Sequence, residues 1–208
     1  MKKAIYVSLI VILVIGAGLF SYFYFFSDDG EPALNAHNTN TTAAAPSNVV
    51  TSLPSTYIGD DFTLKQMSGW IQGHLTGTLV SFHPQDEQQP AGSAAAAINF
   101  QSYIAVSFDA TGGKTFADVY QQTIDDITAA IPETTVFATS EEAVSGLPAR
   151  LAAMEFTRQE VEYTVLVAVY YANERYYVVT FNTTTALWME YKDGFYEVAR
   201  SFALKSTP

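Results

Sequence analysis

Apolar and polar positions divide the chain into three regions. Residues 4–26 form an uncharged, mostly apolar run, and residues 27–57 are rich in Asn, Thr, Ala, Ser and Pro with almost no apolar period. From about residue 58 onward, apolar residues alternate or recur in helical steps. The pattern predicts an N-terminal anchor at 1–26, a disordered polar tether at 27–57 and one folded domain at 58–208.

The third region contains several stretches that are typical of strands. In these stretches apolar residues alternate with polar ones, or β-branched and aromatic residues cluster between turn residues. Pro84 ends the second stretch because proline lacks the N–H that a strand ladder needs. The expected strands cover residues 62–66, 79–83, 96–106, 135–139, 149–157, 161–171 and 175–182.

Two helices are expected in the same region. Thr115 and Asp118 form a start signal close to a capping box, and Pro132 ends the stripe that follows. A second stripe begins at about Thr184 and includes Gly194, which costs about 1 kcal/mol relative to alanine in a helix interior. The apolar residues that recur every three or four positions are Phe116, Val119, Tyr120, Ile124, Ile127 and Ile131 in the first helix, and Leu187, Tyr191, Phe195, Val198 and Phe202 in the second.

The last two strands are predicted to form a long hairpin with a two-residue turn at 173–174. This register places Tyr171 opposite Tyr176 and Tyr170 opposite Tyr177. Because both faces of the hairpin are apolar, both should be covered. One face carries Tyr163, Val165, Val167, Val169 and Val178, and the other carries Leu166, Ala168, Val179 and Phe181.

Two helices and about six strands, apart from the short stretch at 135–139, predict an α+β fold because the strands are adjacent in sequence. The expected architecture is an α/β/α sandwich with a central antiparallel sheet and a helix on each face. The expected order is β-β-β-α-β-β-β-α, preceded by one transmembrane helix.

The uncharged run of 23 residues is long enough to span a bilayer as a helix. Lys2 and Lys3 precede it, and Asp28 follows it. Since positive charge stays inside, the chain is expected to be a single-pass protein of the cell membrane, with a cytoplasmic N-terminus and an extracytoplasmic domain. A cleaved signal peptide is the alternative, for which a shorter apolar region and a small-residue cleavage site are typical.

Charge narrows the range of partners. The chain has 10 basic and 21 acidic residues, and every acidic residue follows the anchor. Such a domain repels nucleic acid and anionic lipid surfaces, so its only expected membrane contact is the anchor.

Cysteine is absent, which excludes disulfides and thiolate chemistry. Asn40-Thr41-Thr42 matches a glycosylation sequon, and the sequence leaves open whether Asn40 or Asn182 is modified.

Two motifs suggest chemistry at specific residues. Residues 112–115 (Gly-Gly-Lys-Thr) mimic the end of a phosphate-binding loop, but the glycine that the full motif needs is replaced by Phe108. A glycine turn followed by Thr115 as helix N-cap explains the segment better. His74 and His83 lie nine residues apart, and with Asp86 and Glu87 they are candidate ligands for a divalent metal.

The remaining candidate functional residues are three acidic pairs and a cluster of tyrosines. Neighbouring carboxylates on a strand or helix point in different directions, so the acidic pairs are interpreted as a solvated surface. The tyrosines at the hairpin tip suit contacts with peptides or glycans, but packing beneath the helices is favoured. The pairs are Asp60-Asp61, Asp125-Asp126 and Glu141-Glu142, and the tyrosines are Tyr170, Tyr171, Tyr176 and Tyr177.

Several short features follow one another in a specific order between about residues 62 and 205. They are Trp70, the strand 79–84, Ala97-Ile98-Asn99-Phe100, the helix start Thr115-Phe116, the turn Gly146-Leu147-Pro148-Ala149, the strand 176–181 and the helix end Ser201-Phe202. In this order they resemble the PsbP/Mog1-like superfamily, which includes bacterial PsbP-like and DcrB-like envelope proteins. The resemblance implies an α/β/α sandwich and no single activity. No functional residue is transferred from it.

The expected function is a non-enzymatic, membrane-tethered module that binds or helps to assemble other envelope proteins. No catalytic, cofactor-binding or metal-ligating residue is assigned, and no cofactor is expected. One alternative is a ligand- or cation-binding domain that uses the acidic surface or the region of His74 and His83. The other is a hydrolase whose acid and base come from scattered carboxylates.

Overall fold

The computed structural model describes residues 55–205. The predicted anchor and nearly all of the predicted tether lie outside the described residues. Strand β1 begins at Thr56, so the folded part includes the last two residues of the predicted tether. Within residues 55–205, no helix has both the length and the apolar character that a membrane span requires.

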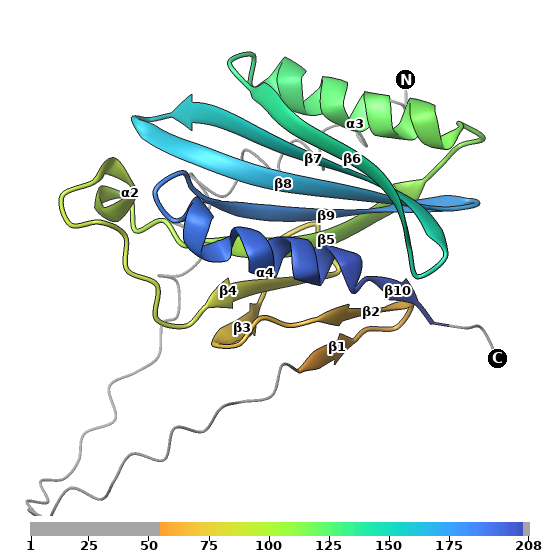
Figure 1. Ribbon diagram of the computed structural model, residues 1–208, viewed down its shortest axis with the longest axis horizontal. Coiled ribbons are helices and arrows are strands. Elements are labelled where there is room, and N and C mark those ends of the chain that lie inside the picture. The colour runs from red at the N-terminus through yellow and green to blue at the C-terminus, as the bar shows by residue number, and fades with distance from the viewer. Residues whose placement is uncertain (1–54, 206–208) are drawn as a thin grey trace, which may run out of the picture.

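The main sheet is built from seven strands in the order β3-β4-β5-β9-β8-β7-β6 (Figure 1). Every neighbouring pair is antiparallel, which confirms the predicted α+β class with an antiparallel sheet. The strands are β3 (Trp70–Gly73), β4 (Val80–Pro84), β5 (Tyr103–Ala110), β6 (Thr135–Val144), β7 (Leu147–Arg158), β8 (Val161–Ala172) and β9 (Arg175–Thr184).

Three helices and a second, smaller sheet complete the described part of the chain (Figure 1). The small sheet is antiparallel and has the order β1-β2-β10. Its strands are β1 (Thr56–Ile58), β2 (Phe62–Lys65) and β10 (Ala203–Leu204), and the helices are α2 (Ala94–Ala97), α3 (Phe116–Ala130) and α4 (Trp188–Arg200).

The predicted hairpin and its two apolar faces are confirmed. Strands β8 and β9 pair Tyr171 with Tyr176 and Tyr170 with Tyr177. Side chains such as Val167 belong to the core on the α3 side of the sheet. The alternate side chains, such as Ala168, belong to the core on the α4 side, together with residues of the small sheet. The two longer helices therefore cover opposite faces of one sheet.

Helix α3 begins where the start signal predicts. The Thr115 hydroxyl accepts a hydrogen bond from the Asp118 N–H at 3.3 Å, and the Thr115 N–H donates to the Asp118 carboxylate at 3.2 Å. This is a complete capping box. Hydrogen bonds from the Thr115 side chain and then from its backbone lower the pKa of Asp118.

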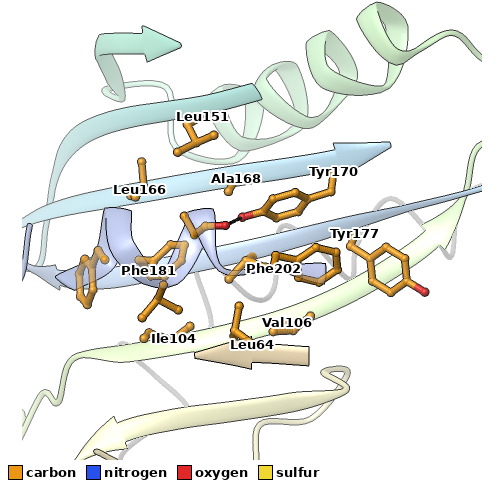
Figure 2. Packing of buried hydrophobic residues seen from close by; sticks show 14 of the residues in the cluster. Leu64, Ile104, Val106, Leu151, Leu166, Ala168, Tyr170, Tyr177, Phe181 and Phe202 are labelled. Atoms are coloured by element: carbon orange, nitrogen blue, oxygen red, sulfur yellow. Dashed lines mark hydrogen bonds between the residues drawn. The ribbon is translucent and has the colours of Figure 1, made fainter. Parts of the chain in front are cut away.

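Aromatic rings fill the core on the α4 side (Figure 2). Phe202 follows α4 and stacks on Tyr170 with ring centroids 4.3 Å apart. It also stacks on Phe62 of β2 at 5.4 Å, so it joins the small sheet to the main one. A Cβ at Gly194 would lie 2.6 Å from the terminal carbon of Met67, a flexible side chain that would have to move aside for any larger residue.

Several predicted boundaries were wrong. The expected strand at 96–106 is instead helix α2, a short connection and β5, because Ser93 caps an alanine run with high helix propensity. Strand β6 continues to Val144, beyond the expected end at 139, and β4 includes Pro84. Strand β9 extends to Thr184, so α4 starts at Trp188 and not at Thr184.

Candidate functional site

The two histidines line one small pocket at the β3–β4 end of the main sheet. Ser81 of β4 pairs with Gly73 of β3, and a Cβ at Gly73 would lie 2.9 Å from the ring of His83. Glycine therefore leaves the space in which this imidazole lies. The pocket has about 30 Å³ available to solvent, which suits an ion or roughly one or two water molecules. Its lining residues are Gly73, His74, Leu75, Ser81, Phe82, His83, Asn99, Gln101, Ser102 and Tyr103.

The two acidic residues that were grouped with the histidines do not line this pocket. The Glu87 carboxylate accepts hydrogen bonds from the Ser102 N–H at 2.6 Å and from the Gln89 amide at 3.0 Å. It therefore anchors the connection between β4 and β5. Asp86 is exposed. Within residues 55–205, no cluster of three or more His, Asp or Glu side chains is arranged to hold a metal ion.

The glycine segment before α3 is a turn and cap. Gly112 and Gly113 have φ angles of +60° and +79°, which glycine adopts without steric cost. The following Thr115 caps the helix through its hydroxyl group. The interpretation as an N-cap after a glycine turn is confirmed.

The acidic pairs contact separate partners at the surface. Asp61 pairs with Arg175 at 3.1 Å. Glu141 pairs with Arg150 at 2.7 Å, and Glu142 pairs with Arg200 at 3.0 Å. Asp125 accepts a hydrogen bond from Gln121, whereas partial burial raises the pKa of its neighbour Asp126. These pairs divide between different surfaces, as the alternation of side-chain direction predicts.

A wide, open groove along α4 also carries carboxylates. Asp193 and Glu197 line it together with Lys65 and Arg200. Lys65 forms an ion pair with Glu197. A general acid needs an enclosed, apolar setting that raises its pKa, and an open groove with a paired carboxylate does not provide one.

The tyrosine cluster is packed, as the favoured interpretation stated. Tyr170, Tyr176 and Tyr177 are buried, and Tyr171 is half-buried. The Tyr170 hydroxyl donates a 2.6 Å hydrogen bond to the Ala199 carbonyl of α4 (Figure 2). The Tyr171 hydroxyl donates to the Lys114 carbonyl at 2.8 Å. Burial raises the pKa of Tyr176 to about 12, with the Asp109 charge as a secondary cause.

Asn182 lies inside the molecule, within strand β9. Its side chain is 3% exposed, and it pairs with Tyr103 and Val165 on the two neighbouring strands. An oligosaccharide cannot reach this amide in the folded domain. Asn40, the other sequon, lies outside the described residues.

The edge position of strand β6 is the feature that sequence reasoning missed. It is the last strand of the main sheet, and in the described part of the chain no strand pairs with its outer edge. Residues 135–141 are all exposed, including Phe137 at 47%. Alternate N–H and C=O groups of an edge strand point outward and are available to a further strand. The exposed valine and phenylalanine inside an otherwise polar strand are the only local signal of this edge.

Comparisons with known proteins bear on the fold. No protein-family model matches the sequence, and comparison with curated proteins gives no match. The solution structure of cyanobacterial PsbP (CyanoP) from Synechocystis sp. PCC 6803 superposes with a TM-score of 0.56 at 16% identity, covering 78% of this chain and 98% of that one. LpqN, involved in cell envelope biogenesis of Mycobacterium tuberculosis, gives 0.55 at 13% identity, covering 76% and 88%.

At sequence identities of 13–16%, structural similarity establishes a shared fold and carries no information about function. The antiparallel sheet and the helix on each face agree with what the sequence resemblance implied. The expected order β-β-β-α-β-β-β-α was wrong, because four strands and not three lie between α3 and α4. The chain thus shares the fold of these two solved structures, PsbP (CyanoP) and LpqN.

Proposed function

We propose that this chain is a membrane-tethered, extracytoplasmic module of the cell envelope that binds or helps to assemble other proteins and performs no catalysis. The observation that carries the proposal is the exposed outer edge of β6, since such an edge is a template for pairing with another chain. The uncharged run at 4–26 and the polar tether support its placement. LpqN, which shares the fold, is an envelope biogenesis protein by its description.

The proposed membrane tether and extracytoplasmic domain predict how the full chain behaves in cell fractionation and protease protection. A C-terminally tagged chain should stay with the membrane fraction through an alkaline carbonate wash, and protease added outside the inner membrane should remove the tag. Deleting residues 4–26 should leave the domain inside the cell. A wild-type chain that washes off the membrane, or a tag that stays protected until the membrane is lysed, would contradict the placement.

Divalent-cation binding is a second candidate function, and the observation that favours it is the pocket shared by His74 and His83. Imidazole nitrogens are ligands for zinc, and the pocket has room for an ion. If the pocket binds zinc, calorimetry on the full chain in detergent micelles should show one site. Replacing His74 or His83 with alanine should weaken binding at least about tenfold, since each removes one ligand. His37→Ala, in the tether, is the control, and equal affinities in all variants would reject the site.

A further inference from the structure

The outer edge of β6 has an apolar centre. Val136 is 37% exposed and Phe137 is 47% exposed. Val136 pairs with Met154, whose side chain lies in the core on the α3 side. Phe137, the extra residue at a bulge, lies on the other face, where its ring meets Trp188 of α4 with centroids 6.5 Å apart. An added strand would therefore find an apolar contact on each face.

Acidic residues lie near both ends of this apolar centre. Glu133 precedes the strand, and the exposed Glu155 of β7 pairs with its first residue. Toward the other end, Glu141 lies on the α3 side next to Arg150, and Glu142 lies on the α4 side next to Arg200. Four carboxylates against two guanidinium groups leave the edge with a net negative charge.

Beyond the bulge, residues 138–144 keep a regular register with β7. Proteins commonly protect an edge strand with charged side chains, above all lysine, with proline or with a bulge. The two charged side chains of β6, Glu141 and Glu142, are paired with Arg150 and Arg200. Residues 135–144 contain no lysine and no proline, and the bulge lies near the start of the strand. A stretch of seven residues remains in which an added strand can form an ordinary ladder.

We propose that β6 accepts, by strand addition, an extended segment of a partner protein that has an apolar centre and basic residues toward both ends. This inference rests on the proposed function and names the class of partner. Main-chain hydrogen bonds to the edge would give affinity, and the acidic ends would select the basic partner.

A second copy of the chain fits this edge poorly. In an antiparallel pair of β6 strands, the start of each strand lies beside the end of the other. Glu133 and Glu155 of one copy would then lie near Glu141 and Glu142 of the other. The described residues include 8 basic and 18 acidic side chains, so two domains also repel each other as a whole. The same charge disfavours a nucleic acid.

The test uses synthetic peptides and the full chain in detergent micelles. The probe is a labelled ten-residue peptide of alternating valine and threonine with two lysines at each end. One matched peptide has glutamates in place of the lysines, and another carries N-methyl groups on alternate amides. Fluorescence anisotropy should show binding of the lysine peptide. The glutamate peptide should bind at least about tenfold more weakly, with the difference shrinking at high salt. The N-methylated peptide should not bind, because it cannot complete the ladder.

Matched variants locate the site. Glu141→Gln with Glu142→Gln should weaken binding of the lysine peptide at least about tenfold. Glu160→Gln with Glu162→Gln removes the same charge at the β7–β8 end and should leave the affinity unchanged. Phe137→Ser should also weaken binding. Phe108→Ser, which replaces a phenylalanine that is similarly exposed on β5, should not.

Four results would overturn the inference. They are equal binding of the lysine and glutamate peptides, full binding of the N-methylated peptide, equal effects of the β6 variants and their controls, and self-association of the chain that Phe137→Ser abolishes. None of them changes where the chain lies in the cell. A failure here is therefore distinguishable from a failure of the tethered placement, which fractionation tests separately.

Discussion

Replacing Phe202 with alanine is expected to lower the free energy of unfolding by about 3–5 kcal/mol. The Phe202 side chain has no solvent exposure, and its ring lies between those of Tyr170 and Tyr177 in the core (Figure 2). The ring centroids of Tyr170, Tyr177 and Phe62 are 4.3, 5.3 and 5.4 Å from that of Phe202. Alanine would leave a cavity at the point where α4, the main sheet and the small sheet meet. Such a site cannot collapse without moving one of these elements.

Denaturant titration of the full chain in detergent micelles measures this loss, with the fluorescence of the buried Trp70 and Trp188 as the signal. Phe108→Ala is the matched control, because this ring is 46% exposed on β5 and should cost about 1 kcal/mol or less. Equal losses for the two variants would mean that Phe202 does not join the two sheets as described. A signal from Trp70 alone would indicate that β3, at the edge of the main sheet, unfolds separately.

Local patterns determine the parts of the fold that were predicted correctly. The β8–β9 hairpin is set by a short turn, at which Asn173 adopts a positive φ of 56°, and by two apolar faces that a one-residue slip would exchange. The start of α3 is set within four residues by Thr115 and Asp118. In both elements, the residues that determine the structure are close neighbours in sequence.

The predicted strand and helix boundaries that were wrong lie where contacts distant in sequence, or competing secondary-structure propensities, determine the structure. Residues 94–97 are four consecutive alanines with no polar residue between them. Their high helix propensity and the N-cap at Ser93 favour a helix, although the segment was predicted to be part of a strand. Asn182 and Thr184 look like the end of a strand, but both are buried inside β9. They belong to a central strand because β5 and β8 flank it, and no local pattern shows this.

The candidate functional sites show the same contrast between features that local sequence determines and features that distant contacts determine. His74 and His83 line one pocket because two adjacent antiparallel strands bring them together, and their role as metal ligands stays a prediction. Adding Asp86 and Glu87 on grounds of sequence proximity was wrong, since the connection turns the Glu87 carboxylate toward Ser102 and Gln89. The edge position of β6 depends on the order of all seven strands. Whether Phe137 is exposed therefore cannot be decided from its neighbours in sequence.

Replacing Tyr170 with alanine is expected to cost about 3–5 kcal/mol, and replacing it with phenylalanine about 1–3 kcal/mol. Tyrosine 170 is fully buried, and its hydroxyl donates to the Ala199 carbonyl at 2.6 Å. Phenylalanine keeps the stacking on Phe202 but leaves that buried carbonyl without this donor. Tyr171→Phe is the control, because this half-buried hydroxyl bonds to a carbonyl near the surface and its loss should cost less than about 1 kcal/mol.

The pH dependence of the free energy of unfolding distinguishes the contribution of the Tyr170 hydroxyl from that of its ring. Burial, and then the nearby Glu142 charge, raises the pKa of Tyr170 above that of tyrosine in an unfolded chain, which is about 10. The stability due to the neutral phenol is therefore fully present below about pH 10 and is lost as the pH rises further, by up to about 1.4 kcal/mol per pH unit. The Tyr170→Phe variant has no such group, so its disadvantage relative to wild type should shrink between about pH 10 and pH 11. A disadvantage that stays constant from about pH 8 to pH 11 would mean that the hydroxyl ionises as freely in the folded chain as in the unfolded one, and that it does not bond to α4.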